Sequence, residues 1–568
     1  MIRTLHPGRL IVLALLLFMI VPAGCVRTAP AQTDNVTAEV APAETTNAVT
    51  VDKGPSGTLR LWWDSDVPQN PLLASGASTR AAYSLVFGQL FQLDSNWQPQ
   101  PELVQDFSYS EERLQLTVSL RPDITFHDSS PVTASDVLAT LNEIQRLGSF
   151  SPYSDALSSY ASGRLIDAKT LVLQLSRPDP AFLYALTFPV LKASEIALPD
   201  GSLWQGTRTW QMSNQSTEGL VLKYAATIPA DESSSGGPHL EQILIKTYTS
   251  AIQAMRALED DELDLAYLPT EALYQYQMRS SLRLDRFASR SYTYFSFGQA
   301  ISDPLDRLRY KYFLRASRWA KTNLAWPGQV TDIPIPAFHA CLNGQPLDLE
   351  PAWLGVLAHN GLAVSHPAQA QAPAPSKPQP DMLLLQPSEE LRIILPEHQT
   401  LLLDLAQQAA EWLEEAGQTA VVVPLPEAEL AADLVSGDYA LAFQTHEMPA
   451  SAEPSWYFAP PVPVEQTAGE GLPEDGANRY DESLNALETG WPFFKYLGYG
   501  LPADEAAADA QSRLYRQVLT DLAIAAPGGG ILLGEAAIAY GDRVIGQCLP
   551  TLATPYLGIE EMWIWSGS

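Results

Sequence analysis

Apolar residues recur along this chain with both the two-residue period of strands and the longer period of helices. Apolar and polar residues alternate over 114–120, which predicts a strand with one buried face. The segment Thr133-Ala134-Ser135-Asp136 has the spacing of a capping box, in which the first and fourth residues bond each other's backbone N–H groups. It therefore predicts the start of a helix.

The same patterns predict an alternation of strands and helices along the rest of the chain. The expected strands are 57–63, 165–166 and 171–175 with a turn at 167–169, 242–248, the alternating aromatics of 292–297, 391–395, 420–423, 439–443, 530–533 and 543–545. The expected helices are 81–93, which leads into a strand, 251–259, 307–321, 401–417 and 511–522. Strands that alternate with helices indicate α/β layers, and the blocks 57–298 and 299–534 suggest two lobes.

Three stretches lack this patterning. Residues 363–389 are rich in Ala, Pro and Gln and are typical of a spacer, and 459–510 read as loops. Residues 26–56 carry few large apolar side chains, so they cannot bury enough surface to offset the entropy of ordering. We expect them to form a flexible tether.

Residues 1–25 are typical of an export signal. A basic start is followed by the apolar run Leu10–Val21, which is shorter than the roughly 20 residues that span a membrane. The run ends at Val21-Pro22-Ala23-Gly24-Cys25, which resembles the bacterial lipobox with Pro in place of the usual Leu. This resemblance implies a lipid on Cys25 and a body outside the cell, anchored in the periplasm or on the outer face. The alternative is a plain secretory signal.

Two cysteines remain in the exported body. Cys341 and Cys548 could form a disulfide, because exported proteins meet oxidising conditions. The alternative is two separate buried thiols.

The composition excludes several partners. The 568 residues hold 34 Lys and Arg against 65 Asp and Glu, which gives 34 − 65 = −31 at pH 7. Nucleic acid binding needs a basic surface, and docking on an anionic membrane needs basic clusters, so both are disfavoured. The charge favours solubility and a bias toward cationic ligands.

The chain offers no convincing catalytic, metal or cofactor motif. Its 8 histidines are scattered, without a pair at helical i, i+4 spacing, and neither a G-x-S-x-G elbow nor a Walker sequence occurs. Gly528-Gly529-Gly530 follows Pro527 and opens a short apolar run, so it predicts a turn into a strand. We expect a protein without enzymatic activity, metal or cofactor.

The run Leu120-Arg121-Pro122-Asp123-Ile124-Thr125-Phe126-His127-Asp128, continued by Pro131-Val132-Thr133-Ala134-Ser135-Asp136-Val137, resembles the signature of the family 5 extracellular solute-binding proteins. These are the peptide and nickel receptors of ABC importers. Ser129 stands where the family usually has Gly. Weaker matches follow in the family's order, including 254–264, where Asp261 replaces a common Gly. The resemblance covers essentially all of 57–568.

The resemblance implies an α/β, periplasmic-binding-protein-like fold of two lobes that close over a ligand at a hinge. Lobe 1 would comprise 57–298 with an extra subdomain at about 95–204, lobe 2 would comprise 299–534, and 535–568 would return to lobe 1. The implied function is the monomeric substrate-binding component of an importer for peptides or similar solutes. Its partners would be the solute, the permease subunits and, through the lipid, the membrane.

The resemblance also implies positions that touch the ligand. Tyr153, in Ser151-Pro152-Tyr153, matches a ligand-binding tyrosine of peptide-binding members, and Trp63 and Asp64 follow the first strand. The acidic residue that holds the peptide's amino group is replaced by Ala450, three places before Glu453-Pro454. Glu447 or Glu453 could substitute for it. Ser216–Gly219 departs from a second family pattern.

Two other functions stay open at this point. Trp63 and Trp456 could stack on sugar rings, as in relatives that bind oligosaccharides, although a single Trp more often fills core. Ala450 and the altered glycines also fit an envelope sensor or structural lipoprotein that kept the fold. An extracellular hydrolase is a more distant alternative.

Overall fold

The computed structural model describes residues 57–565, apart from 180, 226–238, 340–341, 343, 360–389, 450, 452–512 and several positions between 514 and 527. The predicted signal, tether, spacer and second loop-rich stretch lie outside these residues, as does most of the helix predicted at 511–522.

The first sheet has four strands in the order β1-β10-β9-β8. Its strands are β1 (Thr58–Trp63), β10 (Gln242–Thr247), β9 (Gly219–Tyr224) and β8 (Trp210–Ser216). β1 and β10 are parallel, and the other pairs are antiparallel. Helix α1 (Ala77–Tyr83) follows β1 and buries Ala81, Ala82 and Tyr83 against the same core.

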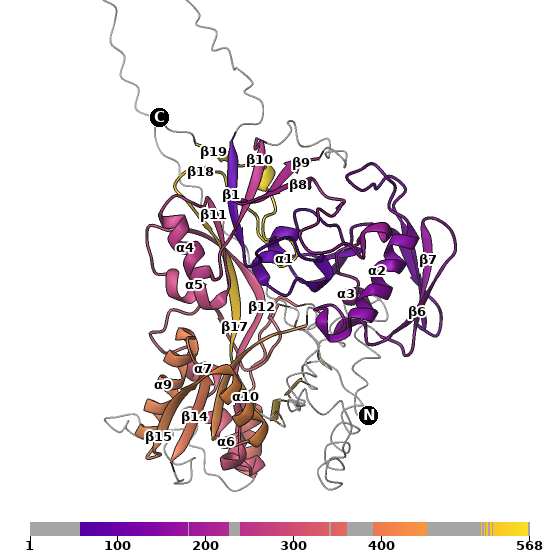
Figure 1. Ribbon diagram of the computed structural model, residues 1–568. Helices are drawn as coiled ribbons and strands as arrows, with labels where there is room; N and C mark the ends of the chain where they lie inside the picture. The colour runs from indigo at the N-terminus through magenta and orange to yellow at the C-terminus, as the bar shows by residue number, and fades with distance from the viewer. Residues whose placement is uncertain are drawn as a thin grey trace, which may run out of the picture. The chain divides into compact units, whose positions relative to one another are not determined.

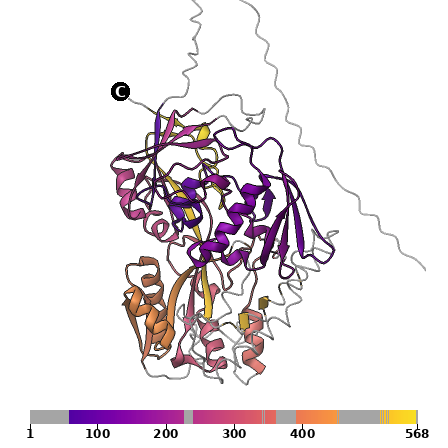
Figure 2. The ribbon, with the colours of Figure 1, turned by 45° about the vertical axis from the view of Figure 1, so that its right-hand side comes forward.

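A second four-stranded sheet is antiparallel, in the order β4-β5-β7-β6. It consists of β4 (Val104–Tyr109), β5 (Gln115–Leu120), β7 (Thr170–Leu175) and β6 (Tyr160–Leu165), with α2 (Ala134–Leu147) beside it and α3 (Phe182–Ala185) nearby (Figure 2). The predicted alternation is confirmed, because Leu116, Val118 and Leu120 are all buried. The predicted capping box is present, with the Asp136 carboxylate accepting the N–H of Thr133 at 2.8 Å.

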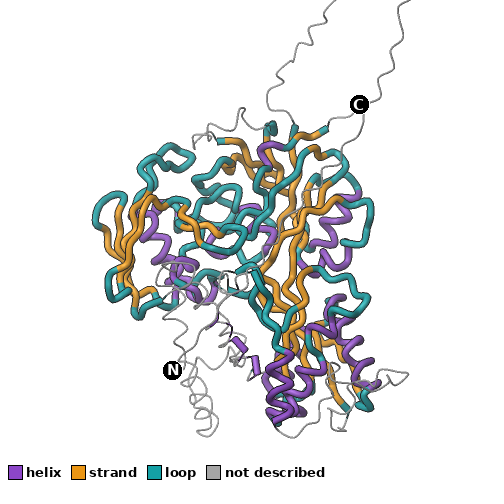
Figure 3. The backbone as a smooth tube through the Cα atoms, turned by 180° about the vertical axis from the view of Figure 1, so that it is seen from behind, coloured by secondary structure: helices purple, strands orange, loops and turns teal. Residues whose placement is uncertain are grey.

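The largest sheet has seven strands and joins distant parts of the chain. Its order is β11 (Leu265–Leu268), β17 (Gly528–Tyr540), β12 (Arg283–Phe297), β16 (Leu441–Glu447), β14 (Leu391–Pro396) and β15 (Ala420–Leu425), with β13 (Gly328–Val330) also on β17. β12 and β17 run antiparallel from the part that holds β1 and β10 to the part that holds β14 and β15 (Figure 1). From behind, the strands continue through both parts, with helices along their sides (Figure 3).

The remaining elements cover these sheets. α4 (Ala251–Glu259) and α5 (Thr270–Tyr276) flank β11, and α9 (Thr400–Glu415) packs on β14 and β15. The others are α6 (Pro304–Phe313), α7 (Ala316–Trp319), α8 (Glu350–His359), α10 (Glu427–Ser436), and the short pairs β2 (Phe91–Leu93) with β3 (Pro99–Pro101) and β18 (Val544–Ile545) with β19 (Trp563–Ile564).

β12 and β17 each contribute to two separate hydrophobic cores. Phe287 and Ile538 belong to the core that also holds β1 and the second sheet, together with C-terminal residues as far as Met562. Phe295 and Ile531 belong to the core formed with β14, β16 and α9. The chain therefore changes from one core to the other twice, within these two paired strands.

Three sequence predictions were wrong in extent. The helix predicted at 81–93 is α1, which ends at Tyr83, and the chain then turns so that the N–H of Gly88 bonds the Thr207 hydroxyl at 2.9 Å. The helix predicted at 307–321 is interrupted by Arg315, whose ψ of 156° is extended. The strand predicted at 530–533 continues to Tyr540, through alanines that have a low strand propensity.

Two residues that replace a glycine expected from the resemblance fall at left-handed backbone positions. Ser129 has a φ of +66° and Asp261 has a φ of +58°. A side chain there crowds the backbone, which costs about 1–2 kcal/mol, although Asp tolerates this conformation better than most residues. These left-handed turns are thus kept at an energetic cost.

We expect Ser129→Gly to raise the free energy of unfolding by about 0.5–1 kcal/mol, because relief of the left-handed strain exceeds the added entropy of the unfolded chain. Chemical denaturation of the purified protein measures this. Ser129→Ala is the matched control, since it keeps the Cβ atom and should bring no gain. Equal effects of Gly and Ala would contradict the strain argument.

Candidate functional site

A cavity of about 1680 Å³ lies where residues of the two cores face each other. We call it the central cavity. Its wall is drawn from α1 and from segments within 83–93, 152–158, 177–189, 267–271, 289–291, 445–451 and 552–555. Its size is above the usual range of small-molecule pockets, about 300–1000 Å³, and suits an extended solute.

A bulge in β12 forms one side of the central cavity. The register between β12 and β17 shifts after Ala288, so that 289–291 lie opposite Gly534. The Ser289 hydroxyl donates to the carbonyl oxygen of Gly534 at 2.9 Å and lies 3.2 Å from the Thr270 hydroxyl. A Cβ atom on Gly534 would lie 2.4 Å from that Thr270 oxygen, so the close packing requires glycine. Bulges redirect side chains, and this one places Arg290 in the cavity wall.

Helix α1 supplies a second arginine. Arg80 lines the cavity and donates from its guanidinium to the carbonyl oxygen of Ser75. The first turn of the helix is held by Asp64, whose carboxylate accepts the hydroxyl of Thr79 at 2.5 Å. Gly76 permits this approach, because a Cβ atom there would lie 2.0 Å from the Asp64 carboxylate.

Glu447, in the last position of β16, links these two arginines. Its Oε1 accepts Nη2 of Arg80 at 2.8 Å and also Nη2 of Arg290. Burial raises the pKa of Glu447, but the charges and hydrogen bonds of Arg290 and Arg80 outweigh it and hold the pKa below its usual value. The three side chains, which we call the Arg80–Glu447–Arg290 cluster, therefore carry a net charge of 2 − 1 = +1.

Two tyrosines lie beside this cluster. Tyr153 and Tyr267 both line the central cavity. Burial raises the pKa of Tyr267 to about 12 and also raises the pKa of Tyr153, against the opposing charges of Arg80 and Arg290. Both hydroxyls thus stay protonated at neutral pH and can donate hydrogen bonds.

The residues that the sequence predicts for the site lie in different surroundings in the structure. It brings Tyr153 and Glu447 to the cavity wall. Trp63 is fully buried, because its ring packs edge-on against Tyr83 at 6.1 Å between centroids, so it belongs to the core behind the wall. Asp64 likewise supports α1 and is not among the wall residues. Glu453, Trp456 and Ala450 lie outside the described residues.

Neither cysteine prediction is tested by the described residues, because Cys25 and Cys341 lie outside them. Cys548 is buried, and its backbone N–H bonds the Tyr540 hydroxyl at 2.7 Å. The pairing of Cys341 with Cys548 stays a prediction.

Sequence reasoning missed Arg80, Arg290 and Tyr267. Arg80 and Glu447 are 367 positions apart in the sequence, so no local pattern indicates that they meet. Arg290 stands in a strand that also carries Arg283, Asp285 and Arg286, so its sequence context gave no distinct signal.

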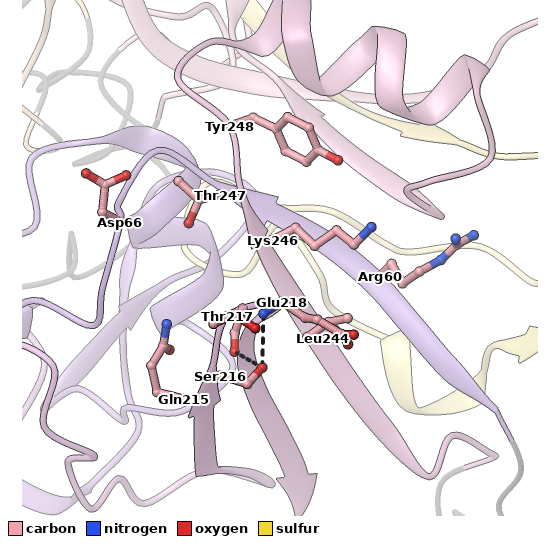
Figure 4. A pocket seen from close by; sticks show the side chains of 11 residues that line it. Arg60, Asp66, Gln215, Ser216, Thr217, Glu218, Leu244, Lys246, Thr247 and Tyr248 are labelled. Carbon is pink, nitrogen blue, oxygen red and sulfur yellow. Dashed lines mark hydrogen bonds between the residues drawn. The ribbon is translucent and has the colours of Figure 1, made fainter.

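A smaller cavity of about 580 Å³ lies against the first sheet (Figure 4). It includes the turn Ser216–Gly219, where the Ser216 hydroxyl accepts the N–H of Glu218 at 3.2 Å and donates to the carbonyl oxygen of Gly219 at 3.3 Å. A Cβ atom on Gly219 would lie 2.1 Å from the carbonyl oxygen of Ile245. The unusual sequence of this segment thus forms the tight turn of the β8–β9 hairpin.

Within the described residues, no three or more His, Cys, Asp or Glu side chains are grouped as metal ligands. In the same residues, no helix has both the length and the apolar character to cross a membrane.

Residues 98–311 match the model of the bacterial extracellular solute-binding proteins, family 5. A "probable peptide ABC transporter periplasmic-binding protein" of Sinorhizobium fredii is 26% identical over 155 residues, which cover 27% of this chain and 28% of that protein. The chain thus aligns with less than a third of the length of this curated relative.

Solved structures share the fold over most of the chain. The ABC transporter substrate-binding protein CtaP of Listeria monocytogenes superposes with a TM-score of 0.64 at 17% identity, covering 90% of this chain and 99% of that one. The oligopeptide-binding protein AppA of Bacillus subtilis, in complex with a nonapeptide, gives 0.58 at 13% identity, with 90% and 100% covered. The predicted α/β periplasmic-binding-protein fold is confirmed.

The lowered pKa of Glu447 predicts how the cluster contributes to stability. A carboxylate with a lower pKa in the folded state stabilises the fold above its unfolded pKa, here 4.5, and loses this contribution as the pH falls through the folded pKa. Since the side chain is half exposed, we expect Glu447→Gln to cost only about 1 kcal/mol at neutral pH. The difference from wild type should shrink below pH 4.5.

Denaturant unfolding of both proteins across this pH range measures the difference. Glu414→Gln, an exposed change on α9, is the matched control and should leave stability unchanged at every pH. A wild-type advantage that stays constant down to about pH 3 would show that the charge of Glu447 is not what stabilises the cluster.

Proposed function

Because the chain belongs to family 5 of the bacterial extracellular solute-binding proteins, we propose that it is the substrate-binding component of an ABC importer for peptides or similar solutes. The observation that carries this proposal is the central cavity, which is enclosed by residues of both cores and has a size suited to an extended solute. The family consists of binding proteins and not of enzymes.

In this proposal the two cores are two lobes that close over the ligand. The predicted lobe 1 comprises 57–298, including a subdomain at about 95–204, and 535–568, and the predicted lobe 2 comprises 299–534. Because Phe295 and Phe297 already pack in the second core, we propose that lobe 2 begins directly after 289–291. The hinge is the bulge at 289–291, because the strand ladder is interrupted there and a few residues can absorb the change in backbone angles. Closure buries the ligand and creates the surface that the permease subunits recognise, and the receptor acts as a monomer.

Ligand contacts in this proposal come from the wall of the central cavity. Tyr153 and Glu447 are the predicted residues that lie in the wall. Glu453 and Trp456 remain predictions for the same site, because they follow β16 in the chain. The names of similar proteins point to peptides as the first ligand class to test, since one of them is a peptide transporter protein and another was solved with a nonapeptide.

We expect the purified protein to bind members of a mixed peptide library, with a gain of about 2.7 kcal/mol in stability at a concentration 100-fold above the dissociation constant. Thermal shift detects this, and native mass spectrometry identifies the bound species. Tyr153→Ala should weaken binding about tenfold through loss of an aromatic contact. Tyr248→Ala is the matched control, since Tyr248 lines the smaller cavity.

Three outcomes would contradict this proposal. Binding lost with Tyr248→Ala but kept with Tyr153→Ala would move the site to the smaller cavity. Stabilisation by oligosaccharides in place of peptides would assign the receptor to another ligand class. No stabilisation by either library would favour a sensor or structural role.

We further propose that a lipid on Cys25 anchors the exported protein to the cell membrane, with 26–56 as a tether. The support is the lipobox-like sequence before Cys25 and the extracellular character of the family. Cys25→Ala removes the acylation site, so we expect the variant to move from the membrane fraction to the soluble extracytoplasmic fraction. Fractionation with immunodetection measures this, and Cys548→Ala is the control. Retention of Cys25→Ala in membranes would refute the anchor.

A further inference from the structure

The Arg80–Glu447–Arg290 cluster has an unusual hydrogen-bond arrangement. Both guanidinium groups donate to the same oxygen, Oε1 of Glu447. Arginine binds a carboxylate best through two parallel N–H···O bonds, one to each oxygen. The single carboxylate of Glu447 therefore satisfies neither arginine in the preferred geometry, and it leaves one positive charge unbalanced.

The cluster is open to the central cavity. The exposed fractions of the side chains are 22% for Arg80, 29% for Arg290 and 48% for Glu447, so a solute in the cavity can reach all three. Tyr153 and Tyr267 stand in the same wall and remain hydrogen-bond donors at neutral pH. The wall thus offers guanidinium donors from the cluster and hydroxyl donors from the two tyrosines.

The other acidic groups of the wall are either engaged or exposed. Glu271 accepts the backbone N–H groups of Thr400 at 2.8 Å and Leu401 at 3.3 Å, at the start of α9. Asp179 accepts the hydroxyl of Ser159 at 2.6 Å and the N–H of Ala181 at 2.9 Å. Asp155 is exposed to solvent. In this wall, a ligand ammonium group therefore meets Glu271 and Asp179, which already have donors, and Asp155, which is exposed to solvent. A ligand carboxylate meets two incompletely satisfied arginines.

We propose that the solute of the central cavity carries a carboxylate, which Arg80 and Arg290 receive, and that Glu447 is the internal substitute for that carboxylate in the ligand-free chain. This inference rests on the proposed binding function and names its ligand class. It assigns Glu447 the opposite role to that expected from the sequence. Glu447 competes with the ligand for the arginines and does not hold the ligand's amino group.

The direction in which one substitution changes the affinity for carboxylate ligands distinguishes these two roles of Glu447. Glu447→Gln removes the competing charge and raises the local charge from +1 to +2, so carboxylate ligands should bind about tenfold more tightly. An ammonium-holding Glu447 predicts weaker binding of the same ligands. Arg80→Gln and Arg290→Gln should each weaken binding about tenfold or more, and Arg290→Lys should recover only part of the loss, because Lys lacks the planar fork.

The experiment uses one mixed tripeptide library in three forms: free acids, C-terminal amides and N-acetylated acids. Isothermal titration of the full-length protein and its variants measures the affinities, with Glu414→Gln as the matched control. We expect both acid forms to bind and the amides to bind at least tenfold more weakly. We also expect Glu447→Gln to increase the affinity for both acid forms.

Other results would overturn either the carboxylate inference alone or the proposed peptide-binding function as well. Equal binding of acids and amides, loss of binding on N-acetylation, or weaker binding by Glu447→Gln overturns the carboxylate inference while leaving a functional receptor. Failure of all three forms to bind overturns the proposed peptide-binding function itself, and the inference with it. Unfolding midpoints of the Arg80 and Arg290 variants show whether a loss of binding reflects a loss of fold.

Discussion

The pairing of β12 with β17 is the interaction on which the rest of the structure depends. These two strands are paired over most of their length, and each has one end in either hydrophobic core. The burial of Phe287 and Ile538 fixes one end, and the burial of Phe295 and Ile531 fixes the other. Neither strand can slip by one residue without turning these side chains out of both cores.

This double constraint explains why the site lies where it does. Between the two cores the ladder is irregular over 289–291, and pairing resumes at Tyr292 and Leu533, which are buried in a smaller cluster. The bulge at 289–291 occupies that interval, and its Ser289–Gly534 and Ser289–Thr270 contacts replace the lost ladder bonds. Residues 289–291 also line the central cavity. The same backbone segment therefore connects the two cores and forms part of the cavity wall.

Much of the fold was predictable because its determinants are local. The alternation at 114–120 and the capping box at Thr133 each involve residues within one element, and both are present in the structure. The long extent of β17 was not predictable, since its alanines become strand only by pairing with β11 and β12. Tyr153 and Glu447, which the resemblance suggested as candidates, line the cavity, whereas the burial of Trp63 depends on Tyr83 across a separate helix.

The polarity of the site shows why total charge is a poor guide to ligand class. The whole chain carries −31, yet the charged cluster in the cavity wall carries +1. Charges farther apart than a Debye length, about 8 Å at physiological ionic strength, are largely screened when exposed. A ligand in the cavity therefore responds to the charged groups of the wall, among them Arg80, Arg290 and Glu447, more than to the charge of the whole chain. Because these residues come from α1, β12 and β16, their charge balance depends on the fold, and composition alone cannot report it.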